Sequence, residues 1–208
     1  MSHASSVETK EQILDVAERA IAENGYAGTT LRSVVSKANV NLAAIHYHFG
    51  SKEELFRAVI ARMAQPIVSG HLTALEAILA ETDTPSVEAI LRAYLQSSFD
   101  YVTCSAITHP TRAQFMGRCR TEPDPVQSIA DKQFRPSTEK FLDALQRSLP
   151  NQTRSQLKWK LDLVVTSLIR VLGEAGKPDA LLNDTTPEGI EAALSKLILF
   201  LLPALESE

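Results

Sequence analysis

Apolar residues recur every three or four positions along most of the chain, and this spacing restricts the fold more than any other sequence feature. The first predicted helix shows it in an apolar stripe made of Ile13, Leu14, Ala17, Ala20 and Ile21. The charged residues of that helix expected to face solvent are Glu11, Asp15, Glu18 and Arg19. No run of β-branched and aromatic residues alternates with period two. The sequence therefore predicts an all-α protein of about nine helices.

Two short helices are predicted between residues 31 and 48. Thr29 or Thr30 can cap the first, at about 31–38, and Asn41 can cap the second, at 42–48, because their side-chain oxygens accept free amide hydrogens. The apolar side chains expected to hold the pair together are Val34, Val35, Ala38, Val40, Ile45 and Phe49. Two short helices joined by a three-residue turn are typical of a helix-turn-helix, whose second helix enters the DNA major groove.

The residues around these helices resemble a known family. The segments concerned are Thr29-Thr30-Leu31-Arg32, Lys37-Ala38-Asn39-Val40 and Ala44-Ile45-His46-Tyr47-His48-Phe49-Gly50-Ser51-Lys52-Glu53-Glu54-Leu55. Over about Glu8 to Ile60 the chain resembles the TetR/AcrR family of bacterial transcriptional regulators. The resemblance implies an N-terminal three-helix helix-turn-helix domain at 1–50 and a C-terminal helical bundle for effector binding and dimerisation at 51–208.

The resemblance also implies roles toward DNA. Residues at phosphate-contacting positions are Thr30, Tyr47, His48 and Lys52, whose side chains can donate hydrogen bonds. Arg32 stands where its guanidinium can pair with guanine, and the methyl groups of Ala43 and Ala44 can pack against thymine. The remaining candidates are Ser33, Asn41, Leu42 and His46. His46 departs from the family, which more often has tyrosine there, so a phosphate contact and a base contact both remain open.

Charge does not mark the chain as a nucleic-acid binder. The net charge is -4, and the first 55 residues carry five Lys/Arg against seven Asp/Glu. Binding is therefore expected to depend on a local positive face, with the acidic groups of the first helix pointing away from DNA. His46 and His48 are two residues apart on one helix and do not share a face, so no metal site is predicted.

The C-terminal part is predicted to consist of longer helices. Thr153 with Gln156, and Thr185 with Glu188, are expected to cap the last two. By resemblance these two helices pair with a second copy through Leu157, Leu161, Val164, Val165, Leu168, Ile190, Leu194, Leu197, Ile198 and Leu201. The aromatic and sulfur side chains expected around a pocket for an unidentified small-molecule effector are Phe99, Tyr101, Phe115, Met116 and Trp159.

These features together predict a cytoplasmic, homodimeric repressor that binds a palindromic operator and is released by a small molecule, with no cofactor and no membrane association. The sequence shows no signal peptide, and its longest apolar run, Leu197 to Leu205, is about half of a membrane span. Control by a protein partner, or by redox or metal chemistry at Cys104 and Cys119, stays open as an alternative. No nucleophile elbow, phosphate loop or paired carboxylates predict an enzyme.

Overall fold

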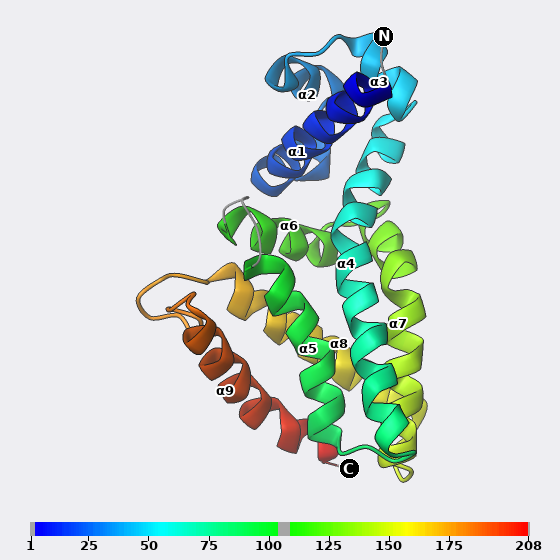
Figure 1. Cartoon of the computed structure of the whole chain (residues 1–208), viewed down its shortest axis with the longest axis vertical. Coiled ribbons are helices and arrows are strands. Elements are labelled where there is room, and N and C mark those ends of the chain that lie inside the picture. Colours follow the sequence, from blue (N-terminus) through cyan, green and yellow to red (C-terminus); the bar gives the residue numbers. More distant parts are fainter. Residues whose placement is uncertain (1–2, 104–108, 208) are drawn as a thin grey trace. The chain divides into compact units, whose positions relative to one another are not determined.

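The computed structural model describes residues 3–103 and 109–207, and within these ranges it contains nine α-helices and no β-strand (Figure 1). The predicted all-α fold is confirmed. The helices are α1 (His3–Gly28), α2 (Leu31–Ala38), α3 (Leu42–His48), α4 (Lys52–Glu81), α5 (Val87–Thr103), α6 (His109–Thr121), α7 (Val126–Ser148), α8 (Arg154–Gly173) and α9 (Pro187–Glu206). None of the described helices has the length and apolarity needed to cross a membrane.

The chain packs into two compact units. The first contains the residues up to Ala64 together with Gln114–Gln133, and the second contains Gln65–Ala113 and the residues from Phe134 onward. Helices α4, α6 and α7 therefore contribute to both units. The unit that holds the helix-turn-helix extends beyond the predicted boundary at residue 50. One reason is aromatic packing, because the ring centroids of Phe56 and Phe115 lie 6.4 Å apart within it.

Helix ends follow the sequence signals in most places. Gly25 has a φ of 71° at a kink inside α1, a left-handed conformation that glycine adopts without strain. Thr153 caps α8 and forms the predicted capping box with Gln156. The cap of α9 is Thr186 rather than Thr185, so that prediction was wrong by one residue. The reason is Pro187, which lacks an N–H and suits the first helical position, so the cap is the residue directly before it.

A neutral aromatic cluster lies in the core of the second unit, where His71 of α4 is buried. Its Nε2 donates to the backbone oxygen of Tyr94 at 2.8 Å, and its Nδ1 lies 3.3 Å from Ser137 Oγ. The ring stacks on Tyr94 with centroids 4.6 Å apart and meets the Phe141 ring edge-on at 5.4 Å. Burial lowers the pKa of His71 to about 4, although the bond to Tyr94 opposes this shift. The imidazole is therefore neutral at physiological pH.

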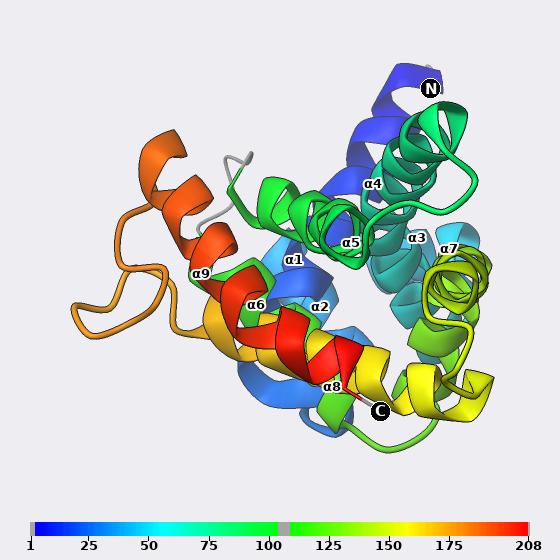
Figure 2. The same cartoon turned by 90° about the horizontal axis from the view of Figure 1, so that it is seen from below.

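Helices α5, α8 and α9 lie side by side in the same unit (Figures 1 and 2). Arg92 of α5 donates to Glu191 of α9 at 2.7 Å. The buried Lys160 of α8 donates to Gln152 Oε1 at 2.7 Å and to the backbone oxygens of Leu205 and Ser207. A cation at the end of a helix is favourable because the last carbonyl groups carry partial negative charge. Lys160 therefore anchors the end of α9.

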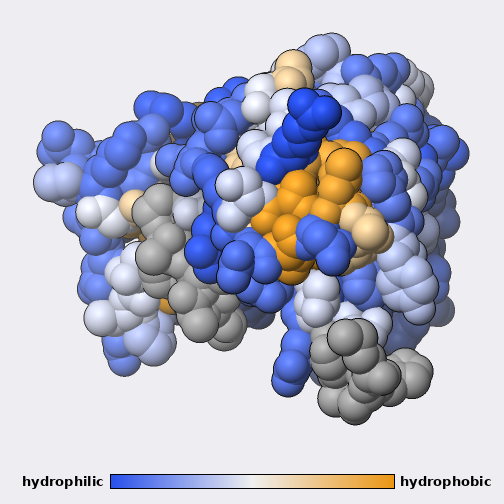
Figure 3. Space-filling model, turned by 90° about the horizontal axis from the view of Figure 1, so that it is seen from above, coloured by the Kyte–Doolittle hydropathy of each residue, from blue (hydrophilic) through white to orange (hydrophobic). Residues whose placement is uncertain are grey.

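The face of the protein shown in Figure 3 is mostly hydrophilic, and hydrophobic residues gather in one compact area of it. The hydrophilic surface agrees with the burial of most large apolar side chains inside each unit.

Candidate nucleic-acid interface

Helix α2 is held by caps at both ends. Thr30 Oγ1 accepts from the Ser33 amide at 3.1 Å, and Ser33 Oγ accepts from the Thr30 amide at 3.2 Å. Ser33 Oγ also donates to the Thr30 backbone oxygen at 2.8 Å, so its hydroxyl hydrogen is already used. The hydroxyl hydrogen of Thr30 remains available to an external acceptor. Asn39 ends the helix in the left-handed conformation, with φ 51°.

Helix α3 presents most of the predicted DNA-binding residues. Asn41 caps it, since its Oδ1 accepts from the Ala44 amide at 2.8 Å. Ile45 is fully buried, and this fixes the inward side of the helix. The exposed residues at and along α3 are Asn41, Leu42, Ala43, His46 and Tyr47, whereas Ala44 and His48 are half-buried. Tyr47 is 81% exposed although it is a large aromatic residue, which favours an external partner for this face.

Two cations accompany this face. Arg32 is exposed on α2, and neither Arg32 nor Lys52 forms an ion pair with another described residue. The Lys52 ammonium lies 4.2 Å from the centroid of the Tyr26 ring. Burial lowers the pKa of Lys52, and the nearby carboxylate of Glu122 opposes that shift. Tyr26 in turn meets Phe56 edge-on at 4.8 Å, so the ring beneath Lys52 is held in place.

Tyr26 is positioned from a distant part of the chain. Its backbone N–H donates to Glu122 Oε2 at 2.9 Å, and Arg118 Nη1 lies 3.4 Å from Glu122 Oε1. A Cβ atom on Gly25 would collide with the Glu122 carboxylate. Glycine suits position 25 through its positive φ, and a side chain there would displace the Glu122 carboxylate that holds Tyr26. Sequence reasoning missed the role of Glu122, because a contact over 96 residues leaves no local signal.

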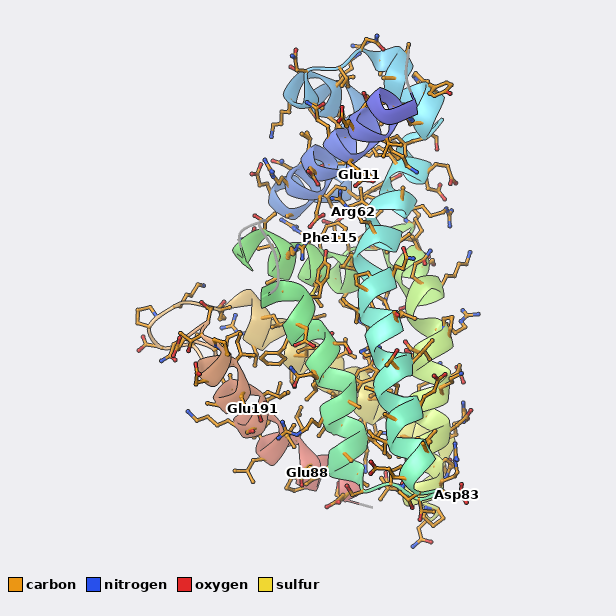
Figure 4. The ribbon with its side chains drawn as sticks, in the orientation of Figure 1. Glu11, Arg62, Asp83, Glu88, Phe115 and Glu191 are labelled. Atoms are coloured by element: carbon orange, nitrogen blue, oxygen red, sulfur yellow. The ribbon has the colours of Figure 1, made fainter. Side chains whose placement is uncertain are left out.

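An ion network compensates part of the negative charge on the acidic side of α1. Arg62 of α4 donates to Glu11 at 3.2 Å, to Asp15 at 2.8 Å and to Glu18 at 2.6 Å, and Figure 4 shows Arg62 near Glu11. Burial disfavours the Arg62 cation, but the hydrogen bond and charge of Glu18, followed by those of Asp15, raise its pKa. Glu18 is only 1% exposed, so its predicted outward position was wrong. Its partner Arg62 lies 44 residues away along the chain, and the ion pair offsets the cost of burying the Glu18 carboxylate.

Among the residues that the structure describes, His46 forms a hydrogen bond between its Nδ1 and the backbone oxygen of Gly50, at 2.9 Å. The half-buried His48 ring is nearly perpendicular to the Tyr47 ring, at an interplanar angle of 78°, with centroids 5.0 Å apart. The two histidines therefore point to different surroundings, as expected for residues two positions apart on a helix.

The predicted effector-pocket residues fall in different units. Phe99 is buried in the second unit, and Phe115 and Met116 are buried in the first. The Tyr101 ring is covered by the Arg112 guanidinium at 4.2 Å, whereas Trp159 is exposed on α8. The pocket stays a prediction.

Most of the predicted dimer residues face the core of their own chain. The buried ones are Leu157, Leu161, Val164, Leu168, Leu194, Leu197, Ile198 and Leu201, and the half-buried ones are Val165 and Ile190. The outward apolar side chains of the same helices are Trp159 and Leu163 on α8 and Leu199 and Phe200 on α9. The predicted residues therefore pack mostly within their own chain, and the predicted dimer interface stays a prediction.

Cys119 is buried, with 2% exposure. Burial, followed by the charges of Glu122 and Glu18, raises the pKa of its thiol, so the reactive thiolate is disfavoured. Cys104 lies outside the described residues. Within those residues no group of three or more His, Cys, Asp or Glu is arranged to hold a metal ion.

Two family models match the chain. Residues 13–59 match the model described as bacterial regulatory proteins, tetR family, and residues 88–203, more than half of the chain, match that of the tetracyclin repressor-like C-terminal domain. Among relatives, the nicotine-responsive transcriptional repressor HdnoR of Paenarthrobacter nicotinovorans is 38% identical over 64 residues, which are 31% of this chain and 33% of HdnoR. The transcriptional regulator BetI of Burkholderia thailandensis is 32% identical over 114 residues, or 55% and 56% of the two chains. The chain thus matches only part of each relative.

Solved structures share the fold over nearly the whole length. The fatty acid degradation regulator FadR of Bacillus halodurans superposes with a TM-score of 0.67 at 14% identity, covering 96% of this chain and 97% of that one. A TetR-like regulator from Rhodococcus sp. RHA1 gives 0.64 at 18% identity, with the same coverage of both chains. The outward face of α3, the caps that hold it and the match over both parts of the sequence lead to one assignment: this chain belongs to the tetR family of bacterial regulatory proteins.

Proposed function

We propose that this protein is a cytoplasmic transcriptional repressor that binds a palindromic operator as a homodimer and is released from it by a small molecule. The observation that carries the DNA-binding part is the outward face of α3. Buried Ile45 fixes its orientation, exposed Tyr47 stands on it, and two cations, Arg32 and Lys52, accompany it without ion pairs to other described residues. Such a face supplies both hydrogen-bond donors to DNA phosphates and groups that can contact the bases.

Each residue of this face has a chemical role in the proposal. Lys52, Tyr47, His48 and the free hydroxyl hydrogen of Thr30 bind phosphates, which only accept hydrogen bonds. Arg32 pairs with guanine, and the small side chains at the start of α3 (Ala43 and Ala44) permit close approach to the groove. Ser33 contributes less, because its hydroxyl already serves the cap of α2.

The homodimer is proposed to form through α8 and α9. Four large hydrophobic side chains, Trp159, Leu163, Leu199 and Phe200, are exposed on these helices, and Phe200 is 75% exposed. Exposed apolar residues gathered on two neighbouring helices favour a protein interface. A two-fold dimer also suits the short α3, because two recognition helices read two half-sites about 34 Å apart.

Release by a small molecule is the third part of the proposal. It draws support from the matched relative that is named a nicotine-responsive repressor, and from the C-terminal family match. An effector that favours a form unable to bind the operator would shift the population away from DNA, and the operator would weaken effector binding by the same factor.

The test is selection of bound sequences from a random pool of double-stranded DNA with the full chain. We expect a palindrome with half-sites about one helical turn apart. Arg32→Ala is expected to relax the preference at one position of each half-site, whereas Lys52→Ala should weaken binding to all sequences equally and reduce its salt dependence. Failure of the wild-type chain to enrich any sequence would refute the proposed function.

The dimer is tested separately by sedimentation. Phe200→Glu places a charge in the proposed interface and is expected to give a monomer that binds single half-sites. Leu181→Glu is the matched control, because Leu181 is also an exposed hydrophobic residue but lies outside α8 and α9. A Phe200→Glu protein that remains dimeric would exclude this surface.

A further inference from the structure

We infer that His46 acts as a hydrogen-bond acceptor toward the DNA bases and selects an exocyclic amino group, that of adenine or cytosine, in the major groove. The inference rests on the proposed DNA-binding function and names what one residue of that site reads. Sequence analysis left a phosphate contact and a base contact open for His46. The structure distinguishes them through the hydrogen bond to Gly50.

The bond to Gly50 fixes where the imidazole hydrogen is. His46 Nδ1 lies 2.9 Å from the backbone oxygen of Gly50. A carbonyl oxygen can only accept, so Nδ1 must carry the hydrogen and donate it. In a neutral ring the second nitrogen, Nε2, then has a lone pair and no hydrogen. The side chain is exposed, and no hydrogen bond joins Nε2 to another described residue.

The backbone of the turn after α3 holds the Gly50 carbonyl in place. The Gly50 carbonyl shares a planar peptide group with the Ser51 N–H, which donates to the backbone oxygen of Phe49 at 2.9 Å. The Gly50 N–H donates to the backbone oxygens of Ile45, at 3.3 Å, and His46, at 3.1 Å, and closes the end of the helix. Gly50 has a φ of 75°, a left-handed conformation that other residues adopt only with strain. The orientation of the carbonyl, and with it the tautomer of His46, is therefore built into the turn between α3 and α4.

An Nε2 lone pair restricts what His46 can bind on DNA. Phosphate oxygens are acceptors and would repel it. In the major groove, adenine and cytosine present amino groups that donate, whereas guanine presents two acceptors and thymine an acceptor and a methyl group. The tyrosine more usual at this position has a hydroxyl that can donate to a phosphate. Replacing it by an Nδ1-protonated histidine therefore exchanges a possible phosphate donor for a base-selective acceptor.

The experiment compares sequence selection by the full-length wild type, His46→Phe and His46→Gln. We expect the wild type to prefer adenine or cytosine at one position of each half-site. His46→Phe, which keeps a ring without nitrogen, should lose that preference by about threefold to tenfold, the effect of one neutral hydrogen bond. His46→Gln should retain it in part, because its amide oxygen can accept. Preferences at the other positions should stay unchanged.

His48→Phe is the matched control, since it removes a second imidazole from the same helix. It is expected to weaken binding to all sequences without changing any preference. The same uniform loss in His46→Phe, or a His46-dependent preference for guanine, would overturn the inference while leaving the proposed function intact. A wild-type protein that selects no sequence would instead refute the proposed function, and this inference with it.

Nitrogen NMR of the full chain labelled with ¹⁵N-histidine tests the tautomer without DNA. The His46 signals, assigned by their loss in His46→Gln, are expected to show a protonated Nδ1 and an unprotonated Nε2. A ring protonated at Nε2 would overturn the inference whatever the selection shows. Circular dichroism checks that His46→Phe, His46→Gln and His48→Phe all fold.

Discussion

Two buried polar groups, one in each unit of this protein, are stabilised in opposite ways. In the first unit Glu18 is buried as part of an ion network in which Arg62 joins it to Asp15 and Glu11. In the second unit His71 is buried as a neutral ring between Tyr94 and Phe141. One arrangement needs its charges, and the other needs the absence of a charge. Acid and substitutions should therefore change the stability of the two units differently.

The largest effect is expected from acid acting on the second unit. The folded-state pKa of His71, about 4, lies below its ordinary value of 6.5, so the unfolded chain binds the proton first. The stability contributed by neutral His71 is complete above pH 6.5 and is lost progressively as the pH falls to about 4. The loss amounts to about 3 kcal/mol. Urea unfolding followed by the fluorescence of Trp159, the single tryptophan, measures it within this unit.

The control for this prediction is His71→Phe, which keeps an aromatic ring and removes the titrating group. Carboxyl groups also titrate in this pH range, so the informative quantity is the difference between the two proteins. The wild type should lose stability more steeply between pH 6.5 and 4. If the free energy of unfolding fell equally steeply with pH in both proteins, His71 would not be held neutral in the folded state.

The next largest effect is expected from Arg62→Met. The substitution keeps much of the side-chain volume but removes the positive charge beside buried Glu18. Breaking a buried ion pair from one side typically costs about 3–5 kcal/mol, and the partial exposure of Arg62 reduces this to about 2 kcal/mol. Urea unfolding followed by circular dichroism gives the change in free energy.

A smaller effect is expected at the contact between Glu122 and Tyr26. Glu122→Ala leaves the Tyr26 amide without its acceptor and should cost about 1–2 kcal/mol, while Glu122→Gln, which keeps an acceptor oxygen, should cost less. Both are measured by urea unfolding. Because Tyr26 lies beneath the Lys52 ammonium, Glu122→Ala should also weaken DNA binding more than Glu122→Gln. Equal losses in the two variants would show that the acceptor oxygen is unimportant.

The smallest effect is expected from Arg57→Met, which also removes an arginine of α4 that contacts two carboxylates. Its partners, Glu53 and Glu54, are exposed on the same helix at three- and four-residue spacing. Such pairs contribute about 0.5 kcal/mol or less. In the same unfolding assay Arg57→Met should therefore be nearly as stable as wild type. A loss equal to that of Arg62→Met would contradict the distinction between buried and exposed networks.

Local features of this protein could be predicted from its sequence because their physical causes are local. The caps at Thr30, Asn41 and Thr153 join atoms three residues apart, so the residue types and their spacing contain the information. The inward position of Ile45 follows from the helical period in the same way. The predicted outward face of α3 depended on these two kinds of signal.

Contacts between distant segments could not be predicted in this way. Arg62 and Glu18 are 44 residues apart, and Tyr26 and Glu122 are 96 apart, so no spacing rule connects them. The predicted dimer surface of α8 and α9 stays a prediction for another reason. Both have apolar side chains on more than one side, as Leu197 and Phe200 illustrate, and a pattern alone does not say which side meets the core of its own chain.

Lys160 places an unusual constraint on how this chain can vary. Two of its acceptors, at Leu205 and Ser207, are backbone oxygens, and every amino acid supplies a backbone oxygen. The lysine therefore does not restrict which residue types stand at 205 and 207, but it does require that the polypeptide extends that far. Homologues should differ freely in residue type at 207 while keeping the number of residues after α8, and a deletion should be less tolerated there than any substitution.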